Sequence, residues 1–535
     1  MQTNHTPSRP TVRESVFRFL RDVSIDTVFG NPGSTELPMF RDFPADFRYV
    51  LGLQESVAVG MADGYAQATR KAALVNLHSA AGVGHAMGNI FTAFKNQTPL
   101  IITAGQQARS ILPFDPFLFA AQATDLPKPY VKWACEPARA EDVPLALARA
   151  YHIAMQAPRG PVFVSIPADD WEQVTDWVEP RTVSQSIAPD PASLGELAKA
   201  LNAAHRPAIV VGAGVDRDAA VEKLVTLAVH QQAAVYAAPM SARCGFPERH
   251  PLFAGFLPAW REKIVTQLAA HDFILVVGAP AFSYHVEGNG PHVPAGATLW
   301  QIVDDAQVAA WTPSGNSIVA STDLALDALI AASQPATQRA EPQARAAPPR
   351  VEASMPMSAA FAMQTLDQAR GAHDVVVEEA PGARGTMQQY LPMDGAERFY
   401  TMASGGLGWG MPAAVGVALA RQKQGLPGRV IALLGDGSSM YSIQALYSAS
   451  QLRVPITFVV LNNRRYAALQ EFAPVFGYSQ EEKPAGTDLP DLDFVALARG
   501  QGCDGVRVEH PTKLADVLRR GAQHDGPLLI EIAIQ

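Results

Sequence analysis

The sequence contains little cysteine and no long apolar run. Only three cysteines occur among 535 residues, Cys135, Cys244 and Cys503, far apart and without any Cys-x-x-Cys spacing. Neither a disulfide framework nor a zinc site is therefore indicated, and this usage is typical of a reducing compartment. No apolar run reaches the length that spans a bilayer, so we expect no membrane partner.

The charged residues offer no extended basic surface. Lys and Arg number 42 against 51 Asp and Glu, for a formal charge of −9, and the basic residues form no long strip. This balance argues against nucleic acid as the main partner and favours a small-molecule ligand. Residues 1–10 lack an apolar core and lead into Thr11 and Glu14, which have the spacing of a helix capping box. We expect no secretory signal and a cytoplasmic location.

Short β-branched runs alternate with helix-like segments along the chain. This alternation is typical of parallel sheets covered by helices on both faces. The composition changes at residues 178–191 and 333–356, and the second segment is rich in Pro, Ala, Gln and Arg, which cannot build a core. We predict an α/β fold class with three doubly wound parallel-sheet domains, at residues 1–180, 190–335 and 355–535.

The strongest local signal for chemistry is a pair of strand ends. Gly-Asp-Gly-Ser at residues 435–438 follows one predicted buried strand, and paired asparagines at 462–463 follow the next. Ligands bind at the carboxyl ends of strands in open α/β sheets. Taken alone, the first segment has an ordinary explanation as a tight turn, and the asparagines as helix caps. Their combination favours a phosphate and metal site.

Each residue at these strand ends has a chemical use. Gly437 lets the backbone approach a phosphate, Ser438 can donate a hydrogen bond to it, and a helix predicted after Ser439 points its positive end at it. Asp436 and Asn463 offer oxygens of the kind that Mg²⁺ prefers in a site shared with phosphate.

These segments resemble the cofactor signature of the thiamin diphosphate-dependent 2-oxo acid decarboxylases. Further stretches are similar to the benzoylformate decarboxylases of that family, in the same order and over essentially the whole chain. They are residues 29–38, 53–71, 76–82, 102–109, 279–285 and 405–414. The resemblance implies an aminopyrimidine-binding domain, a middle domain without cofactor duties and a diphosphate-binding domain. It also implies thiamin diphosphate with Mg²⁺ (or Ca²⁺), and a homotetramer with active sites between subunits.

Glu55 stands in an apolar stretch, beside Leu51, Leu53 and Val57. An ionised carboxylate buried without a partner is costly, so its presence needs an explanation. From the residues alone, one explanation is that Glu55 stands at a helix start and pairs with a nearby cation. The resemblance implies another, in which Glu55 bonds a pyrimidine ring nitrogen of the cofactor and assists proton removal from its thiazolium carbon.

The resemblance assigns further roles. The carbonyl of Gly405 holds the exocyclic amine of the cofactor, and Leu407 wedges the cofactor into its bent shape. His78 and His285 match an acid–base pair, which suits imidazole chemistry near neutral pH. Ser34 matches a serine that grips the substrate carboxylate, although a turn or helix cap is the commoner role of such a serine.

Complete residue sets follow from the same resemblance. The implied cofactor-binding residues are Glu55, Gly405, Leu407, Asp436, Gly437, Ser438, Asn463, Arg465 and Tyr466. The implied metal ligands are Asp436, Asn463 and the carbonyl of Arg465. The implied substrate pocket comprises Ser34, Phe117, Leu118, Met402, Ala468, Leu469 and Phe472.

The chain departs from the family pattern at two places. Arg464 and Arg465 stand where related decarboxylases carry small residues, so the side chain of Arg465 is either free to vary or able to touch the diphosphate. Ala380 and Pro381 stand where hydroxyl residues are expected, which leaves the contacts of that segment to the cofactor tail open.

The function implied is the decarboxylation of benzoylformate to benzaldehyde and CO₂, through an ylid and an enamine of the cofactor. One alternative is a relative that acts on aliphatic or indolyl 2-oxo acids, or that joins two carbonyl compounds. Pyruvate decarboxylase-like relatives use adjacent histidines, and no two histidines are adjacent here. A second alternative is a non-catalytic binding or regulatory subunit, which fold alone does not exclude.

Overall fold

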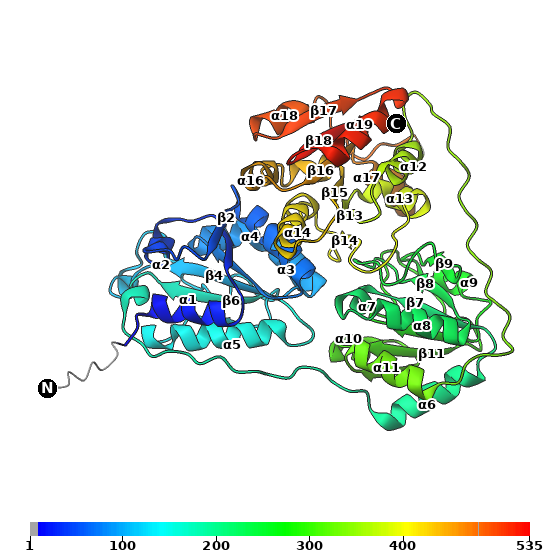
Figure 1. Cartoon of the computed structure of the whole chain (residues 1–535), viewed down its shortest axis with the longest axis horizontal. Helices are drawn as coiled ribbons and strands as arrows, with labels where there is room; N and C mark the ends of the chain where they lie inside the picture. The colour runs from blue at the N-terminus through cyan, green and yellow to red at the C-terminus, as the bar shows by residue number, and fades with distance from the viewer. Residues whose placement is uncertain (1–8, 480) are drawn as a thin grey trace.

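The chain folds into three parallel sheets, each of six strands. The computed structural model describes residues 9–479 and 481–535. Residues 1–8, on which part of the expectation about a secretory signal rests, lie outside that description, as does Gln480. Figure 1 shows the sheets as three lobes joined by long connections. The prediction of three doubly wound parallel α/β domains is confirmed, while the domain boundaries stay a prediction.

The N-terminal sheet has the strand order β2-β1-β3-β4-β6-β5. Its strands are β1 (Thr27–Gly30), β2 (Arg48–Leu51), β3 (Ala73–Leu77), β4 (Leu100–Gln106), β5 (Ala134–Cys135) and β6 (Val162–Pro167). Its helices are α1 (Val12–Asp22), α2 (Leu37–Phe40), α3 (Glu55–Thr69), α4 (Ser79–Asn96) and α5 (Val143–Met155). The capping box predicted from Thr11 and Glu14 is present at α1. Helices α1 and α5 cover one face, and α3 and α4 the other (Figure 1).

The middle sheet has the order β12-β11-β10-β7-β8-β9. Its strands are β7 (Pro207–Val211), β8 (Ala234–Ala237), β9 (Phe253–Phe256), β10 (Phe273–Val277), β11 (Thr298–Val303) and β12 (Asn316–Val319). Its helices are α6 (Pro191–Ala203), α7 (Ala213–Arg217), α8 (Val221–Gln231), α9 (Arg261–Gln267), α10 (Ala306–Trp311) and α11 (Thr322–Ala332).

The C-terminal sheet has the order β14-β13-β15-β16-β18-β17. Its strands are β13 (Val375–Glu379), β14 (Phe399–Thr401), β15 (Val430–Gly435), β16 (Ile456–Asn462), β17 (Asp504–Val508) and β18 (Leu528–Ala533). Its helices are α12 (Ala359–Ala369), α13 (Arg384–Tyr390), α14 (Gly410–Gln424), α15 (Asp436–Met440), α16 (Ala445–Leu452), α17 (Ala467–Phe472), α18 (Phe494–Gly500) and α19 (Pro511–Gln523).

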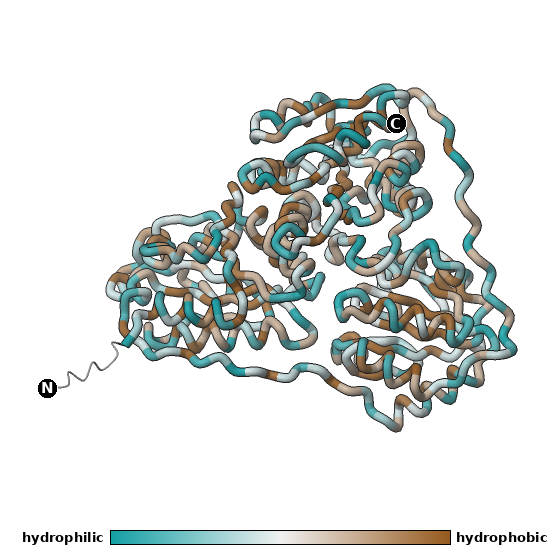
Figure 2. Tube along the Cα trace, in the orientation of Figure 1, coloured by the Kyte–Doolittle hydropathy of each residue, from teal (hydrophilic) through white to brown (hydrophobic). Residues whose placement is uncertain are grey.

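Central strands are apolar because helices cover both of their faces. Strands β3, β7 and β16 are buried at every residue. Figure 2 shows brown, hydrophobic segments running through each lobe, whereas the connections around residues 178–190 and 334–354 are mixed and form neither helix nor strand. No helix within the described residues is long and apolar enough to cross a membrane.

Helices α3 and α14 join the first and third domains. They approach closely because a glycine of each helix faces the backbone of the other: a Cβ at Gly64 would lie 2.8 Å from the Ala413 carbonyl carbon, and one at Gly416 would overlap the Met61 carbonyl oxygen. Asp63 of α3 is fully buried and accepts a hydrogen bond of 2.7 Å from the Trp409 indole. This packing fixes the helix that begins at Glu55 against the loop that precedes α14.

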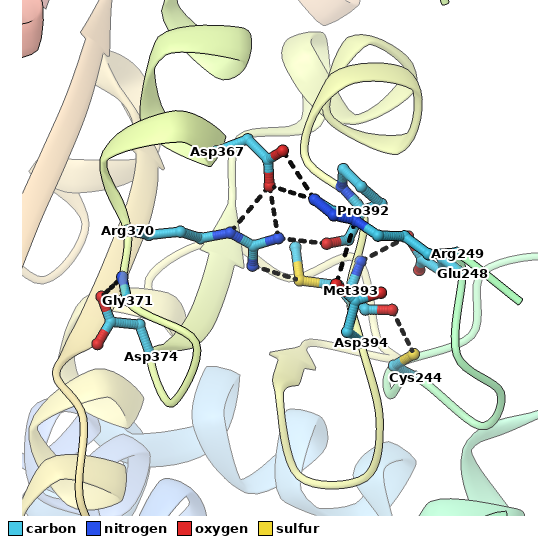
Figure 3. A network of polar contacts seen from close by, with 10 residues as sticks. All are labelled: Cys244, Glu248, Arg249, Asp367, Arg370, Gly371, Asp374, Pro392, Met393 and Asp394. Atoms are coloured by element: carbon cyan, nitrogen blue, oxygen red, sulfur yellow. Dashed lines mark hydrogen bonds and ion pairs between the residues drawn. The ribbon is translucent and has the colours of Figure 1, made fainter. Parts of the chain in front are cut away.

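The middle domain is held to the C-terminal domain by polar contacts (Figure 3). Arg249 bonds Asp367 at 2.8 Å and pairs with Asp394 at 3.2 Å. The carboxylate of the half-buried Glu248 accepts a hydrogen bond of 2.9 Å from the backbone N–H of Met393. Burial raises the pKa of Glu248 to about 8. These contacts set the position of the middle domain, which carries His285.

Candidate active site

Glu55 is the first residue of α3 and is buried, with 9% of its surface exposed. The Gln54 side chain caps this helix by accepting from the Val57 N–H at 3.2 Å. Oε2 of Glu55 lies 3.1 Å from Nδ1 of His85, on the neighbouring helix α4. The apolar stretch around Glu55 predicted buried neighbours, and this is wrong at Leu53, which is 44% exposed because it lies in the loop before the helix.

Ser34 and His78 lie together at the same edge of the N-terminal sheet. Ser34 begins a short 3₁₀ helix (Ser34–Glu36) and is exposed, and His78 precedes α4 directly after β3. Glu36 fixes the imidazole, because its Oε2 lies 2.8 Å from His78 Nδ1. A Cβ at Gly33 would overlap the His78 ring, so glycine is needed for this approach.

Sequence reasoning missed Glu36, although it stands inside the 29–38 segment that carries the family resemblance. It is 1% exposed, and its second oxygen, Oε1, accepts a hydrogen bond of 2.9 Å from the Gly105 N–H. Glu36 therefore links the 3₁₀ helix, the His78 ring and the end of β4. The one signal for it in the sequence is a glutamate two residues after the serine.

Asp436 and Asn463 meet because β15 and β16 are paired, with Gly435 opposite Leu461. The Asn463 N–H donates to Asp436 Oδ2 at 3.1 Å, and the Gly437 N–H donates to Oδ1 at 2.7 Å. Asp436 is 4% exposed, and burial raises its pKa. A carboxylate and an amide thus lie at one sheet edge, where the sequence predicted them.

The helix after this strand begins earlier than predicted. α15 starts at Asp436 rather than after Ser439 and has only five residues. The physical reason is that Gly435, still extended at φ −80° and ψ 156°, is itself the cap residue, so the chain turns into the helix where the strand ends. Ser438 therefore lies inside this single turn.

Arg464, Arg465 and Tyr466 form the loop after β16. Arg464 has a left-handed backbone (φ 59°), and both arginine side chains are exposed. The carbonyl of Arg465 accepts from the Ala467 N–H at 3.0 Å. The Tyr466 ring packs on the turn, since a Cβ at Gly437 would overlap it.

The loop with Gly405 and Leu407 is held from beneath by a residue that sequence reasoning missed. Glu379, at the end of β13, accepts hydrogen bonds from the N–H groups of Gly408 at 2.6 Å and Trp409 at 2.7 Å, and from Gly410. Burial raises the pKa of Glu379 to about 8, against the opposing effect of these donors. Glu379 directly precedes Ala380 and Pro381, the two residues at which this segment departs from the family pattern.

The same loop lies beside the N-terminal helices. Asn89 of α4 donates to the Ser56 carbonyl at 2.7 Å and to the Gly408 carbonyl at 3.2 Å. The residue after Glu55 and the residue after Leu407 are therefore bridged by one amide.

His285 comes from the middle domain and stacks on a residue of the C-terminal domain. Its ring lies 5.0 Å from the Phe472 ring, at an interplanar angle of 21°. Phe472 also meets Phe476 edge-on at 5.4 Å. An imidazole and an aromatic pair thus lie together, next to Leu469 and Ala468 on α17.

The structure places the predicted site residues in two groups within one chain. Glu55, His78 and Ser34 belong to the N-terminal sheet, whereas Asp436, Asn463 and the His285–Phe472 stack belong to the other domains. No hydrogen bond or ion pair in residues 9–479 or 481–535 joins the groups directly. Of the expected pocket residues, Met402 is buried, Ala468, Phe472 and Leu118 are half-buried, and Phe117 and Leu469 are 87% and 55% exposed.

Comparison with known proteins identifies the domains. Residues 10–123, 194–329 and 382–532 match the N-terminal TPP binding domain, the central domain and the C-terminal TPP binding domain of thiamine pyrophosphate enzymes. The benzoylformate decarboxylase of Pseudomonas aeruginosa is 42% identical over 98% of this chain and 99% of its own. Acetolactate synthase isozyme 3 large subunit of Escherichia coli is 27% identical over 94% of this chain and 91% of its own.

Solved structures agree. The benzoylformate decarboxylase of Polynucleobacter necessarius is 40% identical, with a TM-score of 0.95 over 98% of both chains. The thiamine diphosphate-dependent 4-hydroxybenzoylformate decarboxylase of Rhodococcus jostii RHA1 is 38% identical, with a TM-score of 0.94 over 98% of this chain and 99% of its own. The two strand ends at Asp436 and Asn463 and the buried Glu55 thus lie in two thiamin diphosphate-binding domains, and the chain belongs to the thiamine pyrophosphate enzyme family.

Proposed function

We propose that this protein decarboxylates aryl 2-oxo acids, with benzoylformate as the type substrate, to the aldehyde and CO₂. The observation that carries the proposal is the stack of His285 on Phe472, which puts a proton-transfer group against an aromatic surface that suits an aryl ring. The likeness to benzoylformate decarboxylases over the whole chain supports it.

The residues at the strand ends fit a metal-bridged diphosphate. Asp436 is buried and accepts hydrogen bonds from backbone N–H groups. In the described part of the chain, it pairs with no Lys, Arg or His side chain, so a bound cation would supply the missing positive charge. Mg²⁺ would take Asp436, Asn463 and the Arg465 carbonyl as ligands. No group of three His, Cys, Asp or Glu residues forms a metal cluster within the described residues, which fits a site completed by phosphate oxygens.

The remaining cofactor contacts come from backbone and apolar side chains. We expect Gly437, Ser438 and Tyr466 around the diphosphate, the Gly405 carbonyl at the exocyclic amine, and Leu407 under the bend. When bound, thiamin diphosphate supplies an electron sink for the carbon that loses CO₂.

The acid–base roles follow from position. Glu55 would hold a proton at a pyrimidine ring nitrogen. His78, oriented by Glu36, and His285, oriented by the Phe472 stack, would deliver and remove protons at the substrate carbon and oxygen. Ser34, exposed beside His78, would bind the substrate carboxylate.

Two copies of the chain are needed to complete this site, in our proposal. Glu55 and Asp436 belong to different domains, and apolar side chains at the site edge, such as Phe117 and Phe476, are 87% and 73% exposed in the single chain. We therefore propose the homotetramer that the resemblance implies, with each site between subunits. The cytoplasmic location expected from the sequence stays a prediction.

The substrate class is tested with three acids. Benzoylformate, pyruvate and indolepyruvate are incubated with the protein, with and without thiamin diphosphate and Mg²⁺, and CO₂ is followed. Burying a phenyl ring against Phe472 and Leu469 is worth about 1.5–3 kcal/mol over a methyl group, so benzoylformate should exceed pyruvate in kcat/KM by at least about tenfold. A preference for pyruvate or indolepyruvate favours the alternative relatives, and no CO₂ from any acid favours a regulatory subunit.

A further inference from the structure

Asn462, the residue before the proposed metal ligand Asn463, is hydrogen-bonded through both atoms of its side-chain amide. The nitrogen donates to Glu531 Oε1 at 2.7 Å, and the oxygen accepts from the Arg464 N–H at 3.0 Å. Asn462 ends β16 and is 5% exposed, while Glu531 lies on the neighbouring strand β18 and is 0% exposed. Both side chains are already enclosed within one chain, so assembly with a second copy leaves this contact unchanged.

The carboxylate of Glu531 is a costly group in the interior of a sheet, because a buried charge needs a partner. Its one ion pair among the described residues, with Arg507 of β17, is 3.5 Å long, and Arg507 pairs more closely with Glu509, at 2.9 Å. Glu531 Oε2 bonds no residue in the part of the chain that the structure describes. The hydrogen bond from Asn462 is therefore the shortest polar contact of this carboxylate.

Glu531 fixes the orientation of the Asn462 amide. An ionised carboxylate only accepts hydrogen bonds, so the amide N–H₂ must face it and the amide oxygen must face the Arg464 N–H. That oxygen accepts from an N–H two residues further on, which closes a turn. Arg464 has φ 59° in this turn, a left-handed backbone that residues with a side chain rarely adopt, so the turn needs a contact that holds it.

This turn sets where the proposed metal ligands lie. Asn463 and Arg465 stand on either side of Arg464, and the Asn463 N–H donates to Asp436 Oδ2 at 3.1 Å. A reversed Asn462 amide would set its N–H₂ against the Arg464 N–H, so that two donors would face each other and the turn would open. The places of Asn463 and of the Arg465 carbonyl relative to Asp436 would change with it.

We propose that Glu531 is a positioning residue for the metal site, which acts through Asn462 on the loop that presents Asn463 and the Arg465 carbonyl to Mg²⁺. The inference rests on the metal site of the proposed function and deepens it. Groups that hold metal ligands in place typically change metal affinity by about 10–100-fold when they are replaced.

The test exchanges the two partners. Asn462→Asp sets a second carboxylate against Glu531, whereas Asn462→Asp combined with Glu531→Gln restores the hydrogen bond in the reverse direction and keeps the net charge. Full-length protein freed of cofactor receives a fixed concentration of thiamin diphosphate, Mg²⁺ is titrated, and binding is followed by quenching of tryptophan fluorescence. Asn462→Asp should raise the half-saturating Mg²⁺ concentration by at least about tenfold, although its added negative charge alone would lower it. The double variant should return to within about threefold of the unaltered protein.

Two further variants separate the position of the loop from the stability of the sheet. Thr457→Val removes a buried hydrogen bond of 2.7 Å from Arg429 near the other end of β16, so it should lower Tm without changing the half-saturating Mg²⁺ concentration. Glu531→Met removes the acceptor without adding a charge, and it decides the question if Asn462→Asp does not fold. Glu531→Met should also raise the half-saturating Mg²⁺ concentration by about tenfold.

The proposal is overturned by an unchanged or lower half-saturating Mg²⁺ concentration in Asn462→Asp or, if that variant does not fold, in Glu531→Met. Failure of the double variant to recover overturns it as well, because the two side chains then do not act as a pair. An equal loss in Thr457→Val also overturns it, since sheet stability then explains the effect. Asp436→Ala should abolish the dependence of binding on Mg²⁺, and a normal dependence in that variant instead overturns the proposed metal site itself.

Discussion

Gly416 is the position at which one added methyl group should separate the two domains that build the site. It lies in α14, against the backbone of α3. An added Cβ would lie 2.7 Å from the Tyr65 nitrogen and 2.9 Å from the Met61 carbonyl carbon, and it would overlap the Met61 oxygen. These are backbone atoms of a packed helix, so a side-chain rotation cannot relieve the overlap and the helices must move apart.

The magnitude follows from two opposing effects. Alanine is favoured over glycine inside a helix by about 0.8–1.0 kcal/mol. Overpacking a well-packed contact costs about 1–3 kcal/mol, and backbone overlap belongs at the upper end of that range. We therefore expect Gly416→Ala to lower the unfolding free energy by about 1–2 kcal/mol.

Gly195 provides the matched control. It lies in the interior of helix α6 and is exposed, and a methyl group added there would meet no atom within 4 Å outside its own helix turn. Only the helix preference acts there, so Gly195→Ala should raise stability by up to about 1 kcal/mol. For a domain of 150–250 residues, 1 kcal/mol shifts Tm by about 2–4 °C, so the Tm of the affected domains should differ between the two variants by at least about 4 °C in differential scanning fluorimetry.

The same substitution should affect the cofactor. Helix α3 begins at Glu55, and α14 follows the loop that holds Leu407, so separation of the helices shifts one against the other. Gly416→Ala should therefore bind thiamin diphosphate more weakly, whereas Gly195→Ala should not. Equal Tm values and equal affinities for both variants would refute this account of the α3–α14 contact.

Three further predictions concern the metal, the histidines and pH. Asp436→Ala should abolish Mg²⁺-dependent retention of thiamin diphosphate on a desalting column, because the ion loses its charged ligand. Arg465→Ala should lose less of the cofactor. Equal losses from both variants would show that the arginine side chain holds the cofactor. His78→Ala and His285→Ala should each lower kcat by about 10²–10⁴-fold with a smaller change in KM, and a loss confined to KM would make that histidine a positioning residue. Burial raises the pKa of Glu248 from 4.5 to about 8, so the folded chain binds the extra proton and its unfolding free energy falls as pH rises between these values. Glu248→Gln should flatten that fall in Tm measured from pH 5 to 9, and an unchanged profile would contradict the assignment.

Much of the architecture was determined by local sequence. The segment 73–77 is apolar at four of its five residues, and it forms the fully buried strand β3. The meeting of Asp436 and Asn463 followed from the same pattern, because parallel neighbours end at one sheet edge. None of the six edge strands, β2, β5, β9, β12, β14 and β17, was predicted individually. All but β14 are partly exposed, and partly exposed strands carry a weaker apolar signal.

The tertiary structure alone decided which polar groups support the site. Three hydrogen-bonded pairs show this. Their partners are 69 residues apart in the sequence for Glu36 and Gly105, 29 for Glu379 and Gly408, and 30 for His85 and Glu55. No local pattern encodes such pairs, because each depends on how two distant elements pack. Local sequence also fails to determine burial at Leu53. This apolar residue stands in an apolar stretch, yet it is exposed where the chain turns into α3. Sequence periodicity specifies which face of an element is buried, and packing specifies what that face contacts.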